Sequence, residues 1–179
     1  GGLLRAQTFF ANALAVRFEE SGSLLHLIHK WTMRSCLNAQ REIWDASMDE
    51  IEQVKLRKDV TLRDDQLFAL IEKVRKYETI YKQAGAVHGC ALASREGEIL
   101  MFVEDVGRHN AVDAIAGFMW LEAIDGSDKV FYTTGRLTSE MVIKCAQMRI
   151  PFLVSRSGLT QMGYQIAQKS GITMLGRAS

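Results

Sequence analysis

Hydrophobic residues follow strand and helix periods in turn along the second half of the chain. Two apolar runs, 87–93 and 98–104, flank the turn Arg95-Glu96-Gly97 and predict a β-hairpin. Further downstream, helical spacing alternates with short buried runs. This pattern predicts helices at 109–123, 137–148 and 159–169 and strands at 129–134, 151–155 and 172–175. A hairpin followed by β-α-β-α-β crossovers favours an α/β fold, with a mixed sheet and helices on both faces.

The part of the chain before the hairpin is helical near the hairpin and irregular further upstream. Apolar residues at helical spacing from Leu67 predict a helix that continues to Gly85, with Tyr77 and Ile80 on its buried side. Residues further upstream predict two short strands, at 12–18 and 24–29, and a short helix at 45–56. We therefore expect a small partial α+β region at 1–58 and the α/β core at 59–179.

Composition and charge are those of an ordinary globular domain. Hydrophobic residues make up 47% of the 179 residues and charged residues 24%, and the formal net charge is +1. This balance gives no case for nucleic-acid or membrane-surface binding, and no apolar run approaches the roughly 18 residues of a membrane span. No signal peptide is recognised, so we expect a cytoplasmic protein. The chain opens on Gly1 rather than Met, and whether it is complete at either end stays open.

Three cysteines, an odd number spread far apart, argue against a disulfide framework and for a reducing cytoplasm. Cys36 lies in a polar stretch between Arg34 and Arg41, whose positive charge favours a reactive thiolate. The alternative is that Cys36 is an ordinary small hydrophobic residue. Cys90 and Cys145 belong to apolar segments, so we expect both to be buried and poorly nucleophilic.

Polar residues and glycines gather where three of the predicted strands end and helices begin. Ligands bind at such strand ends in open α/β sheets, and helix N-termini offer unpaired N–H groups to anions. Each stretch alone could supply only turn and cap residues, but three alike, each with an arginine, favour a phosphate-rich ligand. The candidate binding residues are Glu104, Asp105, Gly107, Arg108, His109 and Asn110 in the first stretch, Thr133, Thr134, Gly135, Arg136, Ser139 and Glu140 in the second, and Ser155 and Arg156 in the third, with His88 and Asp113 as further candidates.

The first of these stretches, EDVGRHNAVD, resembles the signature of the FdhD family, the formate dehydrogenase accessory sulfurtransferases. Three further stretches, at 84–92, 133–144 and 151–176, occur in the order that the family shows. The resemblance implies a cytidine-deaminase-like three-layer α/β/α fold. Zinc deaminases of that fold need a shuttle glutamate and a CxxC pair. This chain has neither beside His88 nor after Thr133, so we expect no zinc.

The resemblance also implies a substrate and partners. Family members bind molybdopterin guanine dinucleotide, in the bis form with molybdenum or tungsten, and Arg177 would lie in the last cofactor-binding segment. They receive sulfane sulfur from a cysteine desulfurase and pass it to the metal before the cofactor enters formate dehydrogenase. Cys36 would be the sulfur carrier. The family often has two cysteines at this point, so a non-catalytic cofactor-binding chaperone stays an alternative.

The helix expected at 109–123 is apolar on nearly all sides, because Phe118-Met119-Trp120-Leu121 adds bulk beyond one buried face. A two-fold partner could cover the remainder, and a ligand with two equivalent nucleotide ends suits a paired site. Helices within 45–81 could cover it instead. We expect a homodimer.

Overall fold

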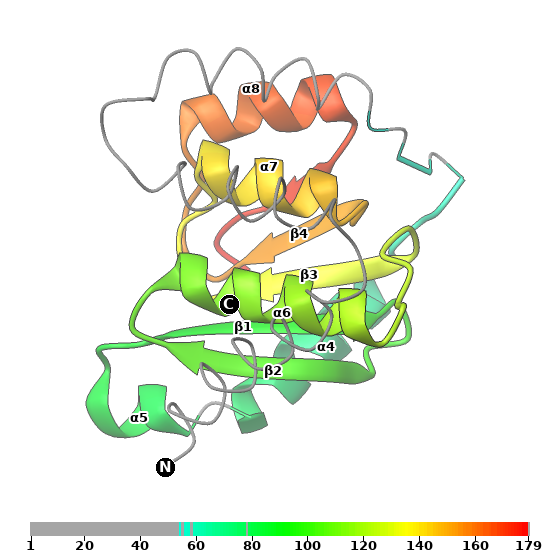
Figure 1. Ribbon diagram of the computed structural model, residues 1–179. Helices are drawn as coiled ribbons and strands as arrows, with labels where there is room; N and C mark the ends of the chain where they lie inside the picture. Colours follow the sequence, from blue (N-terminus) through cyan, green and yellow to red (C-terminus); the bar gives the residue numbers. More distant parts are fainter. Residues whose placement is uncertain (1–53, 55, 58, 78, 179) are drawn as a thin grey trace, which may run out of the picture. The chain divides into compact units, whose positions relative to one another are not determined.

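A five-stranded mixed sheet lies at the centre of the residues that this computed structural model describes, which are 54–178 apart from 55, 58 and 78 (Figure 1). The strands in spatial order are β2 (Ile99–Asp105), β1 (His88–Ser94), β3 (Lys129–Thr133), β4 (Phe152–Ser155) and β5 (Thr173–Leu175). β1 runs antiparallel to both of its neighbours, whereas β3, β4 and β5 are parallel. The expected hairpin, crossovers and mixed sheet are therefore confirmed, and the domain boundary at residue 58 stays a prediction.

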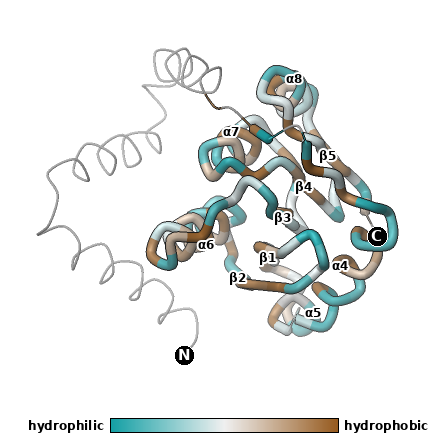
Figure 2. Tube along the Cα trace, turned by 90° about the vertical axis from the view of Figure 1, so that its right-hand side faces the viewer, coloured by the Kyte–Doolittle hydropathy of each residue, from teal (hydrophilic) through white to brown (hydrophobic). Residues whose placement is uncertain are grey.

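Helices cover both faces of this sheet. One face carries α6 (Arg108–Leu121), α7 (Ser139–Gln147) and α8 (Gln161–Ser170). The other carries α4 (Asp64–Tyr77), with the short α5 (Ile80–Ala84) beyond its end (Figures 1 and 2). Among the described residues, no helix combines the length and apolarity that crossing a membrane requires. The three-layer α/β/α arrangement is confirmed.

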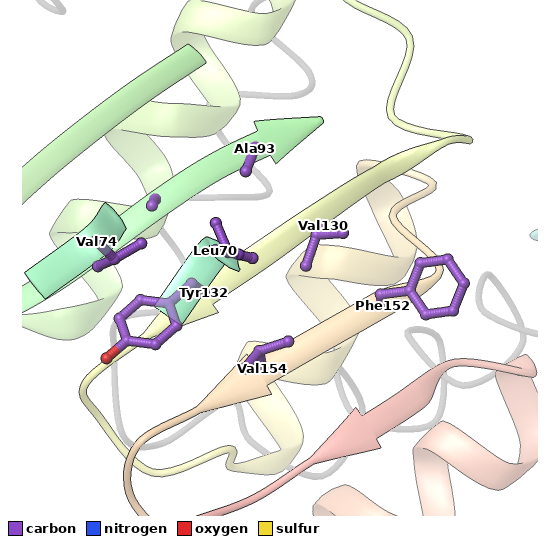
Figure 3. Close-up of a cluster of buried hydrophobic side chains, with 8 residues drawn as sticks. Leu70, Val74, Ala93, Val130, Tyr132, Phe152 and Val154 are labelled. Carbon is purple, nitrogen blue, oxygen red and sulfur yellow. The ribbon is translucent and has the colours of Figure 1, made fainter. Parts of the chain in front are cut away.

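The face under α4 is filled by residues that alternate along the central strands. Leu70 and Val74 of α4 are 1% and 0% exposed, and they pack on a cluster that includes Ala93, Val130 and Tyr132 (Figure 3). Successive strand residues point to opposite faces, so the intervening positions pack beneath α6, α7 and α8 instead. The small alanines of β1 leave room for the larger side chains of α4 and β3.

The expectation that the first helix continues to Gly85 is wrong, because α4 ends at Tyr77 and α5 starts at Ile80. The Glu104 carboxylate, at the end of β2, accepts hydrogen bonds from the backbone N–H groups of Thr79 and Ile80 across 3.2 and 2.9 Å. A carboxylate at this position caps a new helix start. Tyr77 and Ile80 are consequently 50% and 38% exposed rather than buried. Gly85 does end α5, with a φ of 63°.

Truncation of Leu70 should destabilise the fold strongly, because its side chain fills the core between α4 and the sheet. We expect Leu70→Ala to lower the free energy of unfolding by about 2–5 kcal/mol. Phe68→Ala, on the same helix at a 63% exposed position, should change it by less than about 0.5 kcal/mol. Urea unfolding measures both. Similar losses in the two variants would contradict this packing.

Candidate functional site

The predicted binding residues meet along one edge of the sheet. Because β1 runs antiparallel to β2 and β3, its first residue, His88, pairs with Asp105 at the end of β2. Thr133, at the end of β3, pairs with Ser155 at the end of β4. Helices α6, α7 and α8 begin beside these strand ends (Figure 1). The structure therefore brings the three predicted stretches together.

Backbone hydrogen bonds tie the loops after β3, β4 and β5 to one another. The Arg156 N–H donates to the Thr133 carbonyl across 3.1 Å. The Arg177 N–H donates to the Ser157 carbonyl across 2.8 Å, and the Ala178 N–H continues this pairing to the Ser155 carbonyl. Arg136 and Arg177 are exposed on these loops and Arg156 is half-buried. Three arginines thus belong to loops that are fixed to each other.

Thr133 and Ser155 are themselves fully buried, and their hydroxyls face loop backbone rather than solvent. Thr133 Oγ1 accepts from the Gly135 N–H across 3.1 Å, and Ser155 Oγ donates to the Gly135 carbonyl across 2.7 Å. Thr134 is half-buried, and its hydroxyl accepts from the Gly89 N–H across 3.0 Å. These hydroxyls, which the sequence offered as ligand donors, hold the edge of the sheet together.

The two acidic residues at the end of β2 also organise local structure. Asp105 Oδ1 accepts from the Gly107 N–H across 2.7 Å and from the Asn110 side-chain amide across 3.1 Å, which fixes the turn into α6. Glu104 caps α5, as described above. Asn110 is exposed and Asp105 is buried, so a ligand at this end of the sheet would meet Asn110 before the Asp105 carboxylate.

Arg108 and His88 form a positive corner against the Gly135 turn. A side-chain Cβ built on Gly135 would lie 3.1 Å from Arg108 Cδ and 3.3 Å from His88 Nδ1, so the glycine permits this close approach. Arg108 Nε is buried without a hydrogen-bond partner among the described residues. Burial and the neighbouring Arg108 charge lower the pKa of His88. The corner therefore holds a permanent cation with an unsatisfied donor, which suits an anionic ligand.

Two side-chain pairs, one of them an ion pair, join α6 to α7 beside this corner. His109 Nε2 lies 3.0 Å from Glu140 Oε2, and Lys144 Nζ lies 2.6 Å from Asp113 Oδ1. The partners lie four residues apart on each helix, so the two pairs stack one turn apart. Lys144 was not among the residues predicted from the sequence. Its position four residues after Glu140, on the same helix face, was the signal available for it.

Burial sets the titration of both α6 side chains. Burial lowers the pKa of His109, and the nearby Lys144 charge lowers this pKa further, while the Glu140 charge raises it. Burial raises the pKa of Asp113, although the Lys144 charge acts to lower it. Glu140 is exposed, so solvent screens its pairing with His109. The neutral imidazole of His109 is therefore favoured between α6 and α7.

No three His, Cys, Asp or Glu side chains form a metal-binding group within the described part of the chain. The prediction of no zinc stays a prediction. His109 and Glu140 occupy the facing helix starts, and the residues around them are Arg108, Ser139 and Lys144 rather than cysteines. The donors gathered at this edge are therefore mostly those that bind anions.

The structure describes two of the three cysteines, Cys90 and Cys145. Cys90 and Cys145 are both 0% exposed, as the sequence predicts. Burial raises the pKa of Cys90 to about 12 and raises that of Cys145 well above its ordinary value, so neither thiol is a ready nucleophile. Cys36, with its flanking Arg34 and Arg41, lies outside the described residues.

A model of the FdhD/NarQ family matches residues 11–179. The chain belongs to the FdhD/NarQ family. A relative from Saccharolobus solfataricus, named sulfur carrier protein FdhD, is 35% identical over 122 residues, which are 68% of this chain and 48% of that protein. A protein of the same name from Shouchella clausii is 33% identical over 152 residues, which are 84% and 57% of the two chains. The sequence resemblance to the FdhD family is thereby confirmed.

The fold has a counterpart among solved structures. A crystal structure from Desulfotalea psychrophila, described as a formate dehydrogenase accessory protein, matches with a TM-score of 0.65 and 35% sequence identity. The match covers 72% of this chain and 55% of that one. The present chain spans about half the length of the curated relatives it matches.

Acidification should destabilise the protein through His109. Its pKa in the folded state lies below the ordinary value of 6.5, so the unfolded chain binds the proton first as the pH falls. The stability that depends on the neutral imidazole is complete above about pH 6.5 and is lost as the pH falls from there toward the lowered pKa. His109→Gln, which keeps an N–H donor toward Glu140, should flatten this slope.

Urea unfolding of the parent and variant between about pH 7 and pH 5 measures the difference in slope. Lys169→Gln, at an exposed position in the last turn of α8, serves as a control that removes a charge without adding or removing a group that titrates in this range. Parallel curves for the parent and His109→Gln would contradict the lowered pKa.

Proposed function

We propose that this member of the FdhD/NarQ family is a sulfur carrier in the maturation of formate dehydrogenase. It would take sulfane sulfur from a cysteine desulfurase onto Cys36 and pass it to bound molybdopterin guanine dinucleotide, in the bis form with molybdenum or tungsten. Family membership and the relatives' name, sulfur carrier protein, support the carrier role. The description of the Desulfotalea psychrophila protein supports the link to formate dehydrogenase.

The observation that carries the proposal is the set of loops with arginines at one edge of the sheet. Arg136, Arg156 and Arg177 belong to loops that backbone hydrogen bonds tie together, and Arg108 adds a half-buried charge beside them. Guanidinium groups bind phosphate through paired charge-assisted hydrogen bonds. A ligand with phosphate-bearing ends, such as a dinucleotide cofactor, fits this arrangement, and its guanine identity comes from the family resemblance.

Loading of Cys36 with sulfur needs only thiol chemistry. The Cys36 thiolate attacks the outer sulfur of the desulfurase persulfide, a new S–S bond forms on Cys36, and the donor's S–S bond breaks to release its thiolate. This exchange needs no external oxidant or reductant. Cys90 and Cys145, both buried with raised pKa values, are unsuited to the step. Cys36 is the remaining cysteine of the chain.

The second candidate is a chaperone that binds the cofactor without carrying sulfur. A single cysteine where the family often has a pair keeps this candidate open, because a carrier and a resolving thiol cannot both be present there. The two candidates share the binding edge and differ only at Cys36.

Incubation with a cysteine desulfurase and cysteine should add one sulfur atom to Cys36. Mass spectrometry of the intact protein and of its peptides measures the addition and its position. Cys90 and Cys145 act as internal controls, since burial should keep both unmodified in the folded protein. Cys36→Ala and Cys36→Ser should lose the addition while keeping the fold and nucleotide binding. Full activation of formate dehydrogenase in cells by Cys36→Ala would favour the chaperone instead.

Guanine nucleotide should protect the protein against heat through its arginines. A ligand that binds only the native state adds about 2.7 kcal/mol at a hundredfold excess over its dissociation constant. Arg136→Ala and Arg156→Ala should each weaken GDP binding by about tenfold to a hundredfold, because each removes a charge-assisted bond worth roughly 1.5–3 kcal/mol.

Thermal unfolding with and without GDP measures this protection. Arg75→Ala is the matched control for Arg136→Ala, because it removes a charge of the same kind, also exposed, from α4 on the other face of the sheet. If both site variants keep the protection of the parent, the phosphate assignment is wrong.

A homodimer and a cytoplasmic setting belong to the same proposal. Helix α6 buries Ala111, Val112 and Ile115 against the sheet, and its other sides carry half-buried apolar residues such as Phe118 and Leu121. Such a surface suits a two-fold partner. Reduced cysteines suit the cytoplasm.

A further inference from the structure

The Gly135 turn, between β3 and α7, has its peptide groups bound by buried side-chain hydroxyls. Its N–H donates to Thr133 Oγ1 across 3.1 Å, and its carbonyl accepts from Ser155 Oγ across 2.7 Å. Thr133 and Ser155 pair in register at the ends of two parallel strands, and both are 0% exposed. The turn is therefore held from two strands at once, by side chains that a ligand at the surface cannot touch.

The bonds at Gly135 belong to a longer series of hydrogen bonds that begins in the core of the sheet. We call this series the hydroxyl relay; it joins Cys90, Thr133, Gly135, Ser155 and Ser157. The Cys90 thiol donates to Thr133 Oγ1 across 3.3 Å. Its raised pKa keeps it protonated at neutral pH, so it remains a donor. At the other end, Ser155 Oγ accepts from the Ser157 N–H across 3.0 Å. The relay thus connects β1 to the loops after β3 and β4.

We propose that Thr133 and Ser155 are positioning residues of the binding edge, whose buried hydroxyls fix the Gly135 and Ser157 turns and so set where the adjacent Arg136 and Arg156 present their charges. The inference rests on the proposed function for the identity of the ligand. It assigns the two residues a role through the loops rather than in contact with the cofactor.

The side chains of Arg108 and His88 pack closely against the Gly135 turn, so a movement of the turn would displace them. Arg108 Cδ and His88 Nδ1 lie only 3.1 and 3.3 Å from the position of a Cβ on this glycine. Loss of the Thr133 hydroxyl would leave the Gly135 N–H and the Cys90 thiol buried without their acceptor, which favours a shifted turn. That shift would displace both the Arg108 corner and the neighbouring Arg136.

Thr133→Val and Thr133→Ser test the proposal in the full chain. Valine keeps the shape of threonine and removes the acceptor, whereas serine keeps the acceptor and removes the methyl group. We expect Thr133→Val to weaken GDP binding by about tenfold and to speed hydrogen exchange of the Gly135 amide by at least about tenfold. Thr133→Ser should stay close to the parent in both measurements.

Two results separate positioning from a general loss of stability. Thr133→Val should cost less affinity when Arg136→Ala is already present, because the arginine whose placement it disturbs is gone. Ser127→Ala, which removes the hydrogen bond from the Ser127 hydroxyl to Asp125 in the turn before β3, should leave GDP binding unchanged. GDP binding by Thr133→Val equal to that of the parent overturns the proposal. An equal loss in Thr133→Ser overturns it too, because packing would then explain the effect.

Ser155→Ala keeps the proposal testable if Thr133→Val does not fold. It removes the donor to the Gly135 carbonyl and the acceptor for the Ser157 N–H, so the Ser157 amide should exchange faster and GDP binding should weaken. If the parent binds no GDP, the proposed ligand fails, and amide exchange decides the positioning role separately. Equal exchange at Gly135 in the parent and Thr133→Val, or at Ser157 in the parent and Ser155→Ala, then overturns it.

Discussion

Parallel pairing of β3, β4 and β5 is the constraint on which this structure depends. It brings the ends of three strands to one edge of the sheet, and β3 and β4 have to turn toward a helix there while still buried. Peptide groups at such turns lie beyond the sheet's ladder and need other partners. Hydroxyls of Thr133 and Ser155 supply them for the Gly135 and Ser157 turns. The arrangement of this edge thus follows from satisfying the buried backbone, and the same hydrogen bonds join its loops.

Local sequence patterns were enough to predict most of the helices and strands. Buried runs and helical spacing place every described strand and α6, α7 and α8 to within a few residues, because each period reflects one buried face. The break between α4 and α5 was not predictable in this way. It depends on Glu104, which lies 25 residues beyond Thr79 and becomes its cap only after the sheet has formed. Local propensity carries no information about such a partner.

The candidate site was likewise predictable only in part. Residue types at the strand ends identified the three stretches that the structure brings to one edge, but they did not indicate which hydroxyls turn inward. Thr133 and Thr134 are neighbours of identical type, and one is fully buried against Gly135 while the other bonds the Gly89 N–H. Their roles follow from the alternation of β3 and from what packs on each side. The pairing of Asp113 with Lys144 likewise depends on how α6 and α7 pack together.

Electrostatics at this edge favour a fixed positive charge over a titrating one. His88 and His109 both have pKa values lowered by burial and by neighbouring cations, so at neutral pH the permanent charge comes from guanidinium groups. Lys144 is balanced by Asp113 across α6 and α7. An anionic ligand would therefore meet arginines whose protonation does not change with physiological pH. The thiols of the described residues are kept apart from this surface in the core, protonated and inaccessible. A sulfur carrier built on this fold has to place its reactive thiolate elsewhere in the chain, because the burial of Cys90 beneath this edge suppresses its nucleophilicity.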